Sequence, residues 1–113
     1  MTEPVYSTIS VQDLHELSKN DQSFLLLDVR EDDEYAEFHS TLSRSLPLSR
    51  LMEGRGFDEI KIPKDQSVYI ICRSGRRSAS ACEILNNHGF QKTVNVEGGM
   101  EAWLRAGYPY ARI

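Results

Sequence analysis

The chain has 113 residues, of which 40% are hydrophobic and 27% charged, and its formal net charge is −4. This length suits one domain with its own core, so we expect residues 1–113 to form a single domain. The acidic balance argues against nucleic acid as the main partner. No apolar run is long enough to cross a membrane and residues 1–20 lack a signal-like segment, so we expect a soluble cytoplasmic protein.

Helical and extended patterns alternate through the first half of the chain. The predicted elements are a strand over Val5–Ile9, a helix over Val11–Leu17, a strand over Phe24–Val29, a helix over Glu31–Phe38 and one helical turn over Ser49–Met52. Ser10 precedes the first helix as an N-cap. The strand over Phe24–Val29 is almost entirely apolar, which favours burial on both faces. Residues 39–47 are polar and are predicted to be irregular.

The alternation continues in the second half. Here the sequence predicts a turn over Pro63–Gln66, a central strand over Val68–Ile71, a helix ending near His88, a strand over Thr93–Val96 and a helix over Met100–Arg105. This order predicts an α/β fold with a central parallel sheet and helices on both faces. Ligands of such sheets bind at the carboxyl ends of the strands. We therefore expect three strand ends, Asp28–Arg30, Cys72 and Glu97–Gly98, to meet at one rim.

Cys72 is the strongest candidate for a reactive residue. It directly follows the central apolar strand and opens a loop, Arg73–Ser78, before the helix-forming segment Ala79–Leu85. In a strand–loop–helix unit the N–H groups of the loop and of the helix N-terminus converge on one point and make it electropositive. With three arginines in the loop, this environment should hold the sulfur as thiolate, its reactive form.

Three segments form a recognisable pattern that extends over residues 27–109. They are Leu27–Glu31 with Glu34-Tyr35, Tyr69–Ser78, and Val96–Met100 with Ala102-Trp103 and Ala106–Pro109. In this order and spacing the chain resembles the single-domain rhodaneses, the thiosulfate sulfurtransferase family, and the resemblance implies a rhodanese-like fold. One segment departs from the family pattern Gly-His-Ile-x-Gly-Ala, because Phe38–Ser43 retains only the histidine. We expect the backbone and the pocket wall to differ there.

The resemblance implies a sulfurtransferase with Cys72 as the catalytic residue. The Cys72 thiolate would take the sulfane sulfur of thiosulfate, or of a similar small anionic donor, and form a persulfide. The persulfide would pass its sulfur to cyanide or to a thiol acceptor, which a protein could carry. The substrate-binding residues implied are those of the loop: Arg73, Ser74, Gly75, Arg76, Arg77 and Ser78. No metal and no cofactor are required.

The loop arginines are expected to differ in role. Arg73 and Arg76 should face solvent and attract the anionic end of the substrate, whereas Arg77 could instead be tied into the structure. Arg30 is expected to form a structural ion pair. Cys82 lies about two helical turns beyond the loop, roughly 9 Å along the helix, which is too far for a disulfide to Cys72. We expect Cys82 to be a small core residue.

Two other interpretations stay open. A cysteine-dependent phosphatase or arsenate reductase would resemble His-Cys-x5-Arg, but Ile71 replaces the histidine and Ser78 stands where the arginine would fall. Arg77 comes one residue too early, which gives a shorter loop. The other interpretation is a non-catalytic binding module, like the rhodanese-like domains that lack the cysteine. The presence of Cys72 argues against it, although the divergent segment 38–43 could block the pocket.

Overall fold

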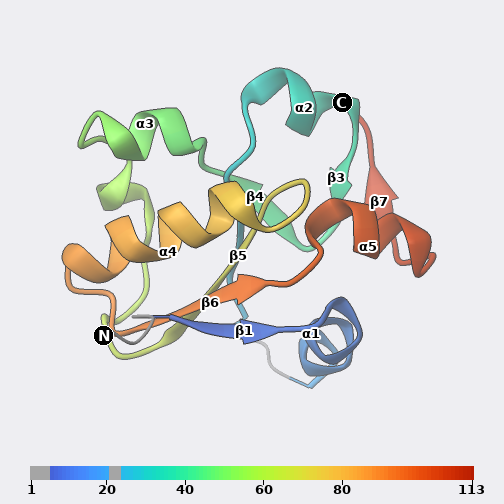
Figure 1. Cartoon of the computed structure of the whole chain (residues 1–113), viewed down its shortest axis with the longest axis horizontal. Coiled ribbons are helices and arrows are strands. Elements are labelled where there is room, and N and C mark those ends of the chain that lie inside the picture. Colours follow the sequence, from blue (N-terminus) through green and yellow to red (C-terminus); the bar gives the residue numbers. More distant parts are fainter. Residues whose placement is uncertain (1–5, 21–23) are drawn as a thin grey trace.

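A five-stranded parallel sheet runs through the middle of the computed structural model, which describes residues 6–20 and 24–113 (Figure 1). Its strands lie in the order β1 (Ser7–Ile9), β6 (Lys92–Val96), β5 (Ser67–Ile71), β2 (Leu26–Asp28) and β4 (Ser43–Ser45). Each neighbouring pair in this sheet is parallel. The central strand is therefore β5, the strand that leads to Cys72.

Helices cover both faces of the sheet, as the alternation of elements predicted. One face carries α3 (Leu48–Met52) and α4 (Arg76–Asn87), and the other carries α1 (Val11–Ser18) and α5 (Gly99–Arg105). The remaining elements are α2 (Asp32–Glu37), the 3-10 turn η1 (Phe57–Glu59), and an antiparallel pair formed by β3 (His39–Ser40) and β7 (Tyr110–Ala111). No helix within the described residues is both long and apolar enough to span a membrane.

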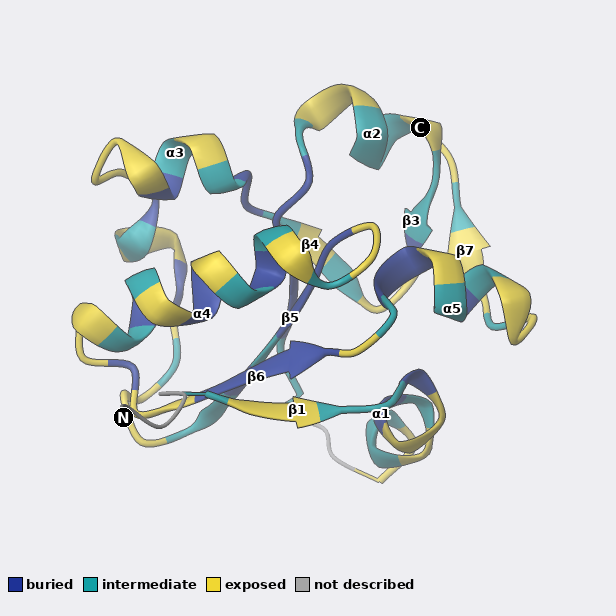
Figure 2. Cartoon of the chain, in the orientation of Figure 1, coloured by how far each residue is buried: buried dark blue, intermediate teal, exposed yellow. Residues whose placement is uncertain are grey.

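Alternate residues of the central strands supply two separate cores. Leu27 of β2 and Ile70 of β5 pack into the core beneath α4, whereas Leu26 and Ile71 pack into the core beneath α1 and α5. Neighbouring side chains of a strand point to opposite faces, so a strand covered on both sides is mostly apolar on each face. Figure 2 shows the resulting band of buried residues along β5 and β6. Trp103 is fully buried in the core under α5.

Most predicted elements occur close to their expected bounds. The Ser10 hydroxyl accepts a hydrogen bond from the N–H of Asp13 at 3.0 Å, which confirms the N-cap of α1. Of the first predicted strand, Val5 lies outside the described residues. The expectation that residues 39–47 are irregular is wrong, because this stretch contains β3 and β4. Within the described residues β4 is an edge strand paired with β2, and of its three polar residues Arg44 is exposed while Ser43 and Ser45 are half-buried.

The predicted boundary between loop and helix is also wrong. α4 begins at Arg76 and not at Ala79, with Gly75 as its N-cap residue at φ +113°. A positive φ is accessible to glycine without strain, so the chain can turn sharply at Gly75 and start the helix immediately. Consequently Arg76, Arg77 and Ser78 belong to the first turn of α4, and the connecting loop is only Cys72–Gly75.

The three strand ends do meet at one rim. Asp28 lies opposite Ile71 in the sheet, and the N–H of Val29 donates to the Ile71 carbonyl at 3.0 Å. The turn after β6 reaches the same place, because the N–H of Met100 donates to the Cys72 carbonyl at 2.7 Å. The carboxyl ends of β2, β5 and β6 therefore surround Cys72.

Candidate active site

The Cys72 sulfur lies inside the turn that joins β5 to α4. The N–H of Gly75 donates to the Cys72 Sγ at 3.1 Å, and the Ser78 hydroxyl oxygen lies 3.3 Å from the same sulfur. The residue is 1% exposed, so the folded chain surrounds the sulfur almost completely. The arrangement follows from the chain direction, since β5 points into the loop and α4 starts with its free N–H groups turned back toward the strand end.

These donors favour the ionised form of Cys72. Burial raises the pKa of the thiol, but the hydrogen bond from the Ser78 hydroxyl and those from the N–H groups of Ser78, Gly75 and Ser74 lower it by more. The net effect is a Cys72 pKa below the ordinary thiol value of 9.0. A thiolate held by fixed backbone dipoles is a nucleophile that needs no adjacent base.

The turn after β6 holds the cysteine loop from behind. Besides the hydrogen bond from Met100 to the Cys72 carbonyl, the N–H of Glu101 donates to the Arg73 carbonyl at 3.1 Å. Gly99 has φ +56°, and a Cβ at this position would come within 2.4 Å of the Cys72 carbonyl oxygen. Only glycine permits this close backbone approach. Gly99 is thus required by the position of the loop, whereas a Cβ on Gly98 would come within 2.7 Å of the Ala102 Cβ on α5.

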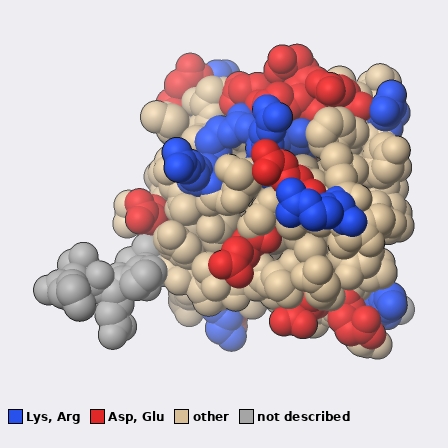
Figure 3. Space-filling model, turned by 45° about the vertical axis from the view of Figure 1, so that its right-hand side comes forward, with Lys and Arg blue, Asp and Glu red and all other residues tan. Residues whose placement is uncertain are grey.

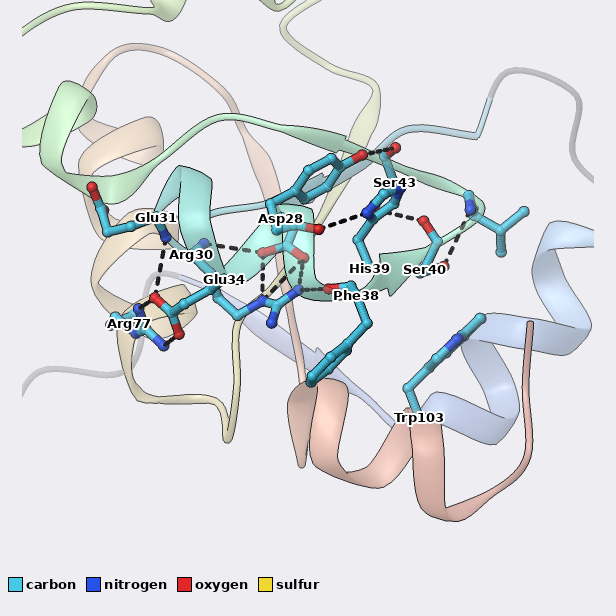
Figure 4. Close-up of polar contacts among 12 residues, drawn as sticks. Asp28, Arg30, Glu31, Glu34, Phe38, His39, Ser40, Ser43, Arg77 and Trp103 are labelled. Atoms are coloured by element: carbon cyan, nitrogen blue, oxygen red, sulfur yellow. Dashed lines mark hydrogen bonds and ion pairs between the residues drawn. The ribbon is translucent and has the colours of Figure 1, made fainter. Parts of the chain in front are cut away.

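The three loop arginines occupy different environments. Arg73 has 71% of its side chain exposed and lies near Glu101, with 3.3 Å between Arg73 Nε and Glu101 Oε1. Arg76 is exposed at the start of α4. Arg77 instead points to α2, where its two terminal nitrogens donate to the carboxylate of Glu34 at 2.6 and 2.8 Å (Figure 4). Figure 3 shows the resulting surface, on which basic side chains adjoin the acidic side chains gathered over α2.

Arg30 forms the structural ion pair that the sequence predicted. Its guanidinium, 2% exposed, donates to both carboxylate oxygens of the fully buried Asp28 and to the carbonyl of Phe38 at 2.6 Å (Figure 4). The Phe38 ring lies 5.1 Å below the same guanidinium. Arg30 therefore fixes the start of the divergent segment 38–43 against the end of β2.

The divergent segment is ordered by contacts of its own. His39 stacks on Tyr35 and its Nδ1 lies 2.7 Å from the Tyr35 carbonyl oxygen, while the Tyr35 hydroxyl donates to the Ser43 carbonyl at 2.9 Å. The side chain of Phe38 also lines a small cavity of about 110 Å³, together with Arg30, Glu34, Glu37 and Arg73. The segment thus contributes to the wall of a cavity beside the cysteine loop. A larger cavity of about 370 Å³, beside β4, contains none of the predicted site residues.

Two features of the site were not predicted from the sequence: the contacts of Asn95, and the ion pair that Glu34 forms with Arg77. Asn95 lies near the end of β6, is 8% exposed, and contacts both Gly75 and Ser78. A polar residue between two valines near the end of a buried strand was the available signal. The partner of Glu34 lies 43 residues away along the chain, and no local pattern indicates it.

Cys82 is separated from this chemistry. Its side chain is fully buried in the core beneath α4. Burial raises the pKa of the Cys82 thiol to about 12, against a smaller opposing effect of the Thr93 hydroxyl. The residue is therefore a protonated, inert core thiol at neutral pH. Within the described residues no cluster of His, Cys, Asp or Glu side chains is arranged to hold a metal ion.

Fold and site together define a parallel α/β domain with a buried cysteine, surrounded by hydrogen-bond donors, at the carboxyl end of its central strand. The chain belongs to the rhodanese-like domain family, whose pattern matches residues 10–106. It is 41% identical over 95 residues to "Putative sulfurtransferase YtwF" of Bacillus subtilis, covering 84% of this chain and 87% of that protein. It is 34% identical over 101 residues to "Sulfurtransferase" of Allochromatium vinosum, covering 89% and 91%.

A solved structure gives the same result for the fold. The crystal structure of a rhodanese-related protein from Thermoplasma volcanium superposes with a TM-score of 0.75 at 34% sequence identity. The match covers 94% of this chain and 98% of that one. The rhodanese-like fold expected from the three sequence segments is thereby confirmed.

Proposed function

We propose that this protein is a sulfurtransferase that carries sulfane sulfur as a persulfide on Cys72. The observation that carries the proposal is the convergence of N–H and O–H groups on the Cys72 sulfur, which lowers its pKa. The names of the relatives from Bacillus subtilis and Allochromatium vinosum support sulfur transfer as the reaction class.

In the first half-reaction the Cys72 thiolate attacks the outer sulfur of thiosulfate. A bond forms between the Cys72 Sγ and that sulfur while the bond to the sulfonate group breaks, and sulfite leaves with the bonding electron pair. The product is a Cys72 persulfide anion, so total charge is conserved. The N–H groups of the turn that stabilise the thiolate are placed to stabilise this anion as well.

In the second half-reaction cyanide or a thiolate attacks the outer sulfur of the persulfide. The new bond takes the sulfur away, and the electron pair of the broken S–S bond returns to Cys72 as thiolate. No proton transfer by the protein is required in either step when donor and acceptor are anions. The acceptor is cyanide, a small thiol or a thiol group carried by a protein.

The burial of Cys72 supports a donor with a single terminal sulfur. Because Cys72 is 1% exposed, a donor must bring its reacting atom end-on into the turn. Thiosulfate can do this, since its outer sulfur carries no further substituents. The exposed Arg73 and Arg76 would attract the sulfonate end that stays outside.

The pairing of Arg77 supports sulfur chemistry over phosphoryl transfer. A phosphatase loop would need an arginine free to contact the phosphoryl oxygens. Arg77 instead donates both terminal nitrogens to Glu34 on α2. With Arg77 so paired and the loop short, we expect negligible hydrolysis of aryl phosphates.

Intact mass spectrometry after incubation with thiosulfate tests the proposal. We expect the protein to gain the mass of one sulfur, the gain to be absent in Cys72→Ser, and to be retained in Cys82→Ser. Subsequent addition of cyanide should remove the added mass and release thiocyanate. Absence of the gain in the folded wild-type protein, or its retention in Cys72→Ser, would overturn the proposed role of Cys72.

A further inference from the structure

Asn95 connects two parts of the cysteine turn from a neighbouring strand. Its side-chain amide nitrogen donates to the Gly75 carbonyl at 3.1 Å, and its amide oxygen accepts a hydrogen bond from the Ser78 hydroxyl. The Ser78 oxygen in turn lies 3.3 Å from the Cys72 sulfur. Cys72, Ser78 and Asn95 therefore form a buried row of three polar side chains, none more than 8% exposed.

The Gly75 carbonyl fixes the direction of this row. The reverse orientation of the Asn95 amide would place its oxygen against the Gly75 carbonyl oxygen, two acceptors facing each other. The Asn95 oxygen therefore faces Ser78, and because that oxygen can only accept, Ser78 must donate to it. While Cys72 is protonated, the single proton of the Ser78 hydroxyl is therefore directed toward Asn95 and away from the cysteine. The bond from Ser78 to the sulfur that lowers the Cys72 pKa belongs to the ionised state.

This arrangement suits a protonated cysteine better than an ionised one. When Cys72 is a thiol, its S–H can donate to the Ser78 oxygen while Ser78 donates to Asn95. When Cys72 is a thiolate, the sulfur offers no proton, and the Ser78 oxygen would face it as a second acceptor at 3.3 Å. The favourable arrangement then requires the Ser78 hydroxyl to turn to the sulfur and give up its bond to Asn95.

We propose that Asn95 is a positioning residue that competes with the Cys72 thiolate for the hydroxyl proton of Ser78 and thereby sets the ionised fraction of the nucleophile. Asn95 does not touch the reacting sulfur and acts through Ser78 alone. The consequence for catalysis rests on the proposed role of Cys72. The competition for the Ser78 proton can be measured without enzymatic turnover. A failure of this proposal is therefore distinguishable from a failure of the proposed sulfur-transfer role of Cys72.

Charged groups lie around the site on the cysteine loop, α4, the end of β2, α2 and α5, and the variants used below change none of them. They are Arg73 in the loop, Arg76 and Arg77 on α4, Asp28 and Arg30 at the end of β2, Glu34 on α2 and Glu101 on α5. Most of them are paired with one another: Arg30 with Asp28, Arg77 with Glu34, and Arg73 with Glu101. Substitution of Asn95 leaves these charges as they are, so a shift in the Cys72 titration midpoint would not come from them.

The decisive experiment titrates Cys72 through the ultraviolet absorbance of its thiolate, a readout that needs no reagent to enter the turn. In Asn95→Leu, which keeps the branched shape but removes the acceptor, the midpoint should fall by about half a pH unit to one unit. In Ser78→Ala it should rise by a similar amount. Cys82, whose pKa is raised to about 12, does not overlap with this range.

The double variant separates competition from mere support of the turn. In the Ser78→Ala background, Asn95→Leu should produce no further shift, because no hydroxyl proton is left to compete for. If Asn95 only braced Gly75, its loss would loosen the N–H donors, and the midpoint would rise in both backgrounds. A rise, an unchanged midpoint, or a shift that persists without Ser78 would each overturn the proposal. Asn86→Leu, whose amide bonds the Phe90 carbonyl at the other end of α4, is the matched control.

A measurement on the wild-type protein covers the case in which Asn95→Leu does not fold. The side-chain amide signals of Asn95 in nuclear magnetic resonance spectra should move with the same midpoint as the thiolate absorbance, because ionisation of Cys72 draws Ser78 away from the Asn95 oxygen. In Ser78→Ala the movement should be lost. Asn95 signals that stay fixed through the Cys72 titration in the wild-type protein would overturn the proposal.

Discussion

The ion pair between Glu34 and Arg77 joins α2 to the first turn of α4, and its contribution to stability can be predicted from its geometry. Hydrogen bonds from Arg77 are the largest cause of a Glu34 pKa of about 2, below the ordinary 4.5, with burial opposing and the N–H of Glu31 adding to the effect. Substitution of Glu34 by Gln keeps the shape and the capping position but removes the charge.

The magnitude follows from this pKa with a correction for solvent. A lowering of the pKa from 4.5 to about 2 would be worth between about 3 and 4 kcal/mol at roughly 1.4 kcal/mol for each pH unit, if the pair were shielded from water. The side chains of Arg77 and Glu34 are 34% and 28% exposed, so screening reduces the value. We expect Glu34→Gln to lower the free energy of unfolding at pH 7 by about 1–1.5 kcal/mol.

The pH dependence gives the sign test. The folded pKa of Glu34 lies below its unfolded value, so the stabilisation is fully present above pH 4.5 and is lost as the pH falls from 4.5 toward 2. Urea unfolding of wild type and Glu34→Gln should differ at pH 7 and converge in acid. Glu59→Gln, in the more exposed pair with Arg50, is the control and should cost about 0.5 kcal/mol or less. The reasoning is refuted if Glu34→Gln costs no more than this control, or if the difference does not shrink in acid.

Three further outcomes are expected. Gly99→Ala should lower the free energy of unfolding by at least about 2 kcal/mol, because the added Cβ would meet the Cys72 carbonyl oxygen at 2.4 Å. The control Gly54→Ala, at φ +79° with open space around the new Cβ, should cost only about 1 kcal/mol. Equal losses for the two variants in urea unfolding would contradict this prediction. Arg73→Gln with Arg76→Gln should raise the KM for thiosulfate roughly fivefold at low salt, with kcat little changed, and an unaltered KM would show that these charges do not bind substrate. Cys82→Ser should lower the melting temperature, because it buries a more polar hydroxyl, while persulfide formation continues.

Local patterns were sufficient for the parts of the fold that bury apolar residues. The apolar run at Phe24–Val29 and the strand before Cys72 are buried on both sides of the sheet, so their composition alone indicates central strands. Strand polarity then required the carboxyl ends to lie together, which is why the rim around Cys72 could be predicted from three distant segments.

The elements that sequence reasoning missed are held by pairing and not by burial. β4 is polar because one side of it is the open edge of the sheet, and β3 and β7 are two residues each and pair across about 70 residues of sequence. The early start of α4 depends on the left-handed conformation of Gly75. In each case the element depends either on pairing with a residue distant in the chain or on one backbone angle. Neither leaves a periodic pattern of apolar residues in the sequence.

The contact between the Gly98-Gly99 turn and the cysteine loop also affects when the protein becomes reactive. During synthesis, β5 and the start of α4 leave the ribosome before β6 and α5, so the chain carries Cys72 for a time without the backbone that holds its loop in place. In that state the N–H groups of Ser74, Gly75 and Ser78 are not yet held in place around the sulfur, so we expect Cys72 to behave as an ordinary thiol, mostly protonated at neutral pH. We therefore expect the docking of β6 and α5 to complete the environment that lowers the Cys72 pKa, and an incomplete or misfolded chain to escape the oxidation that a thiolate invites.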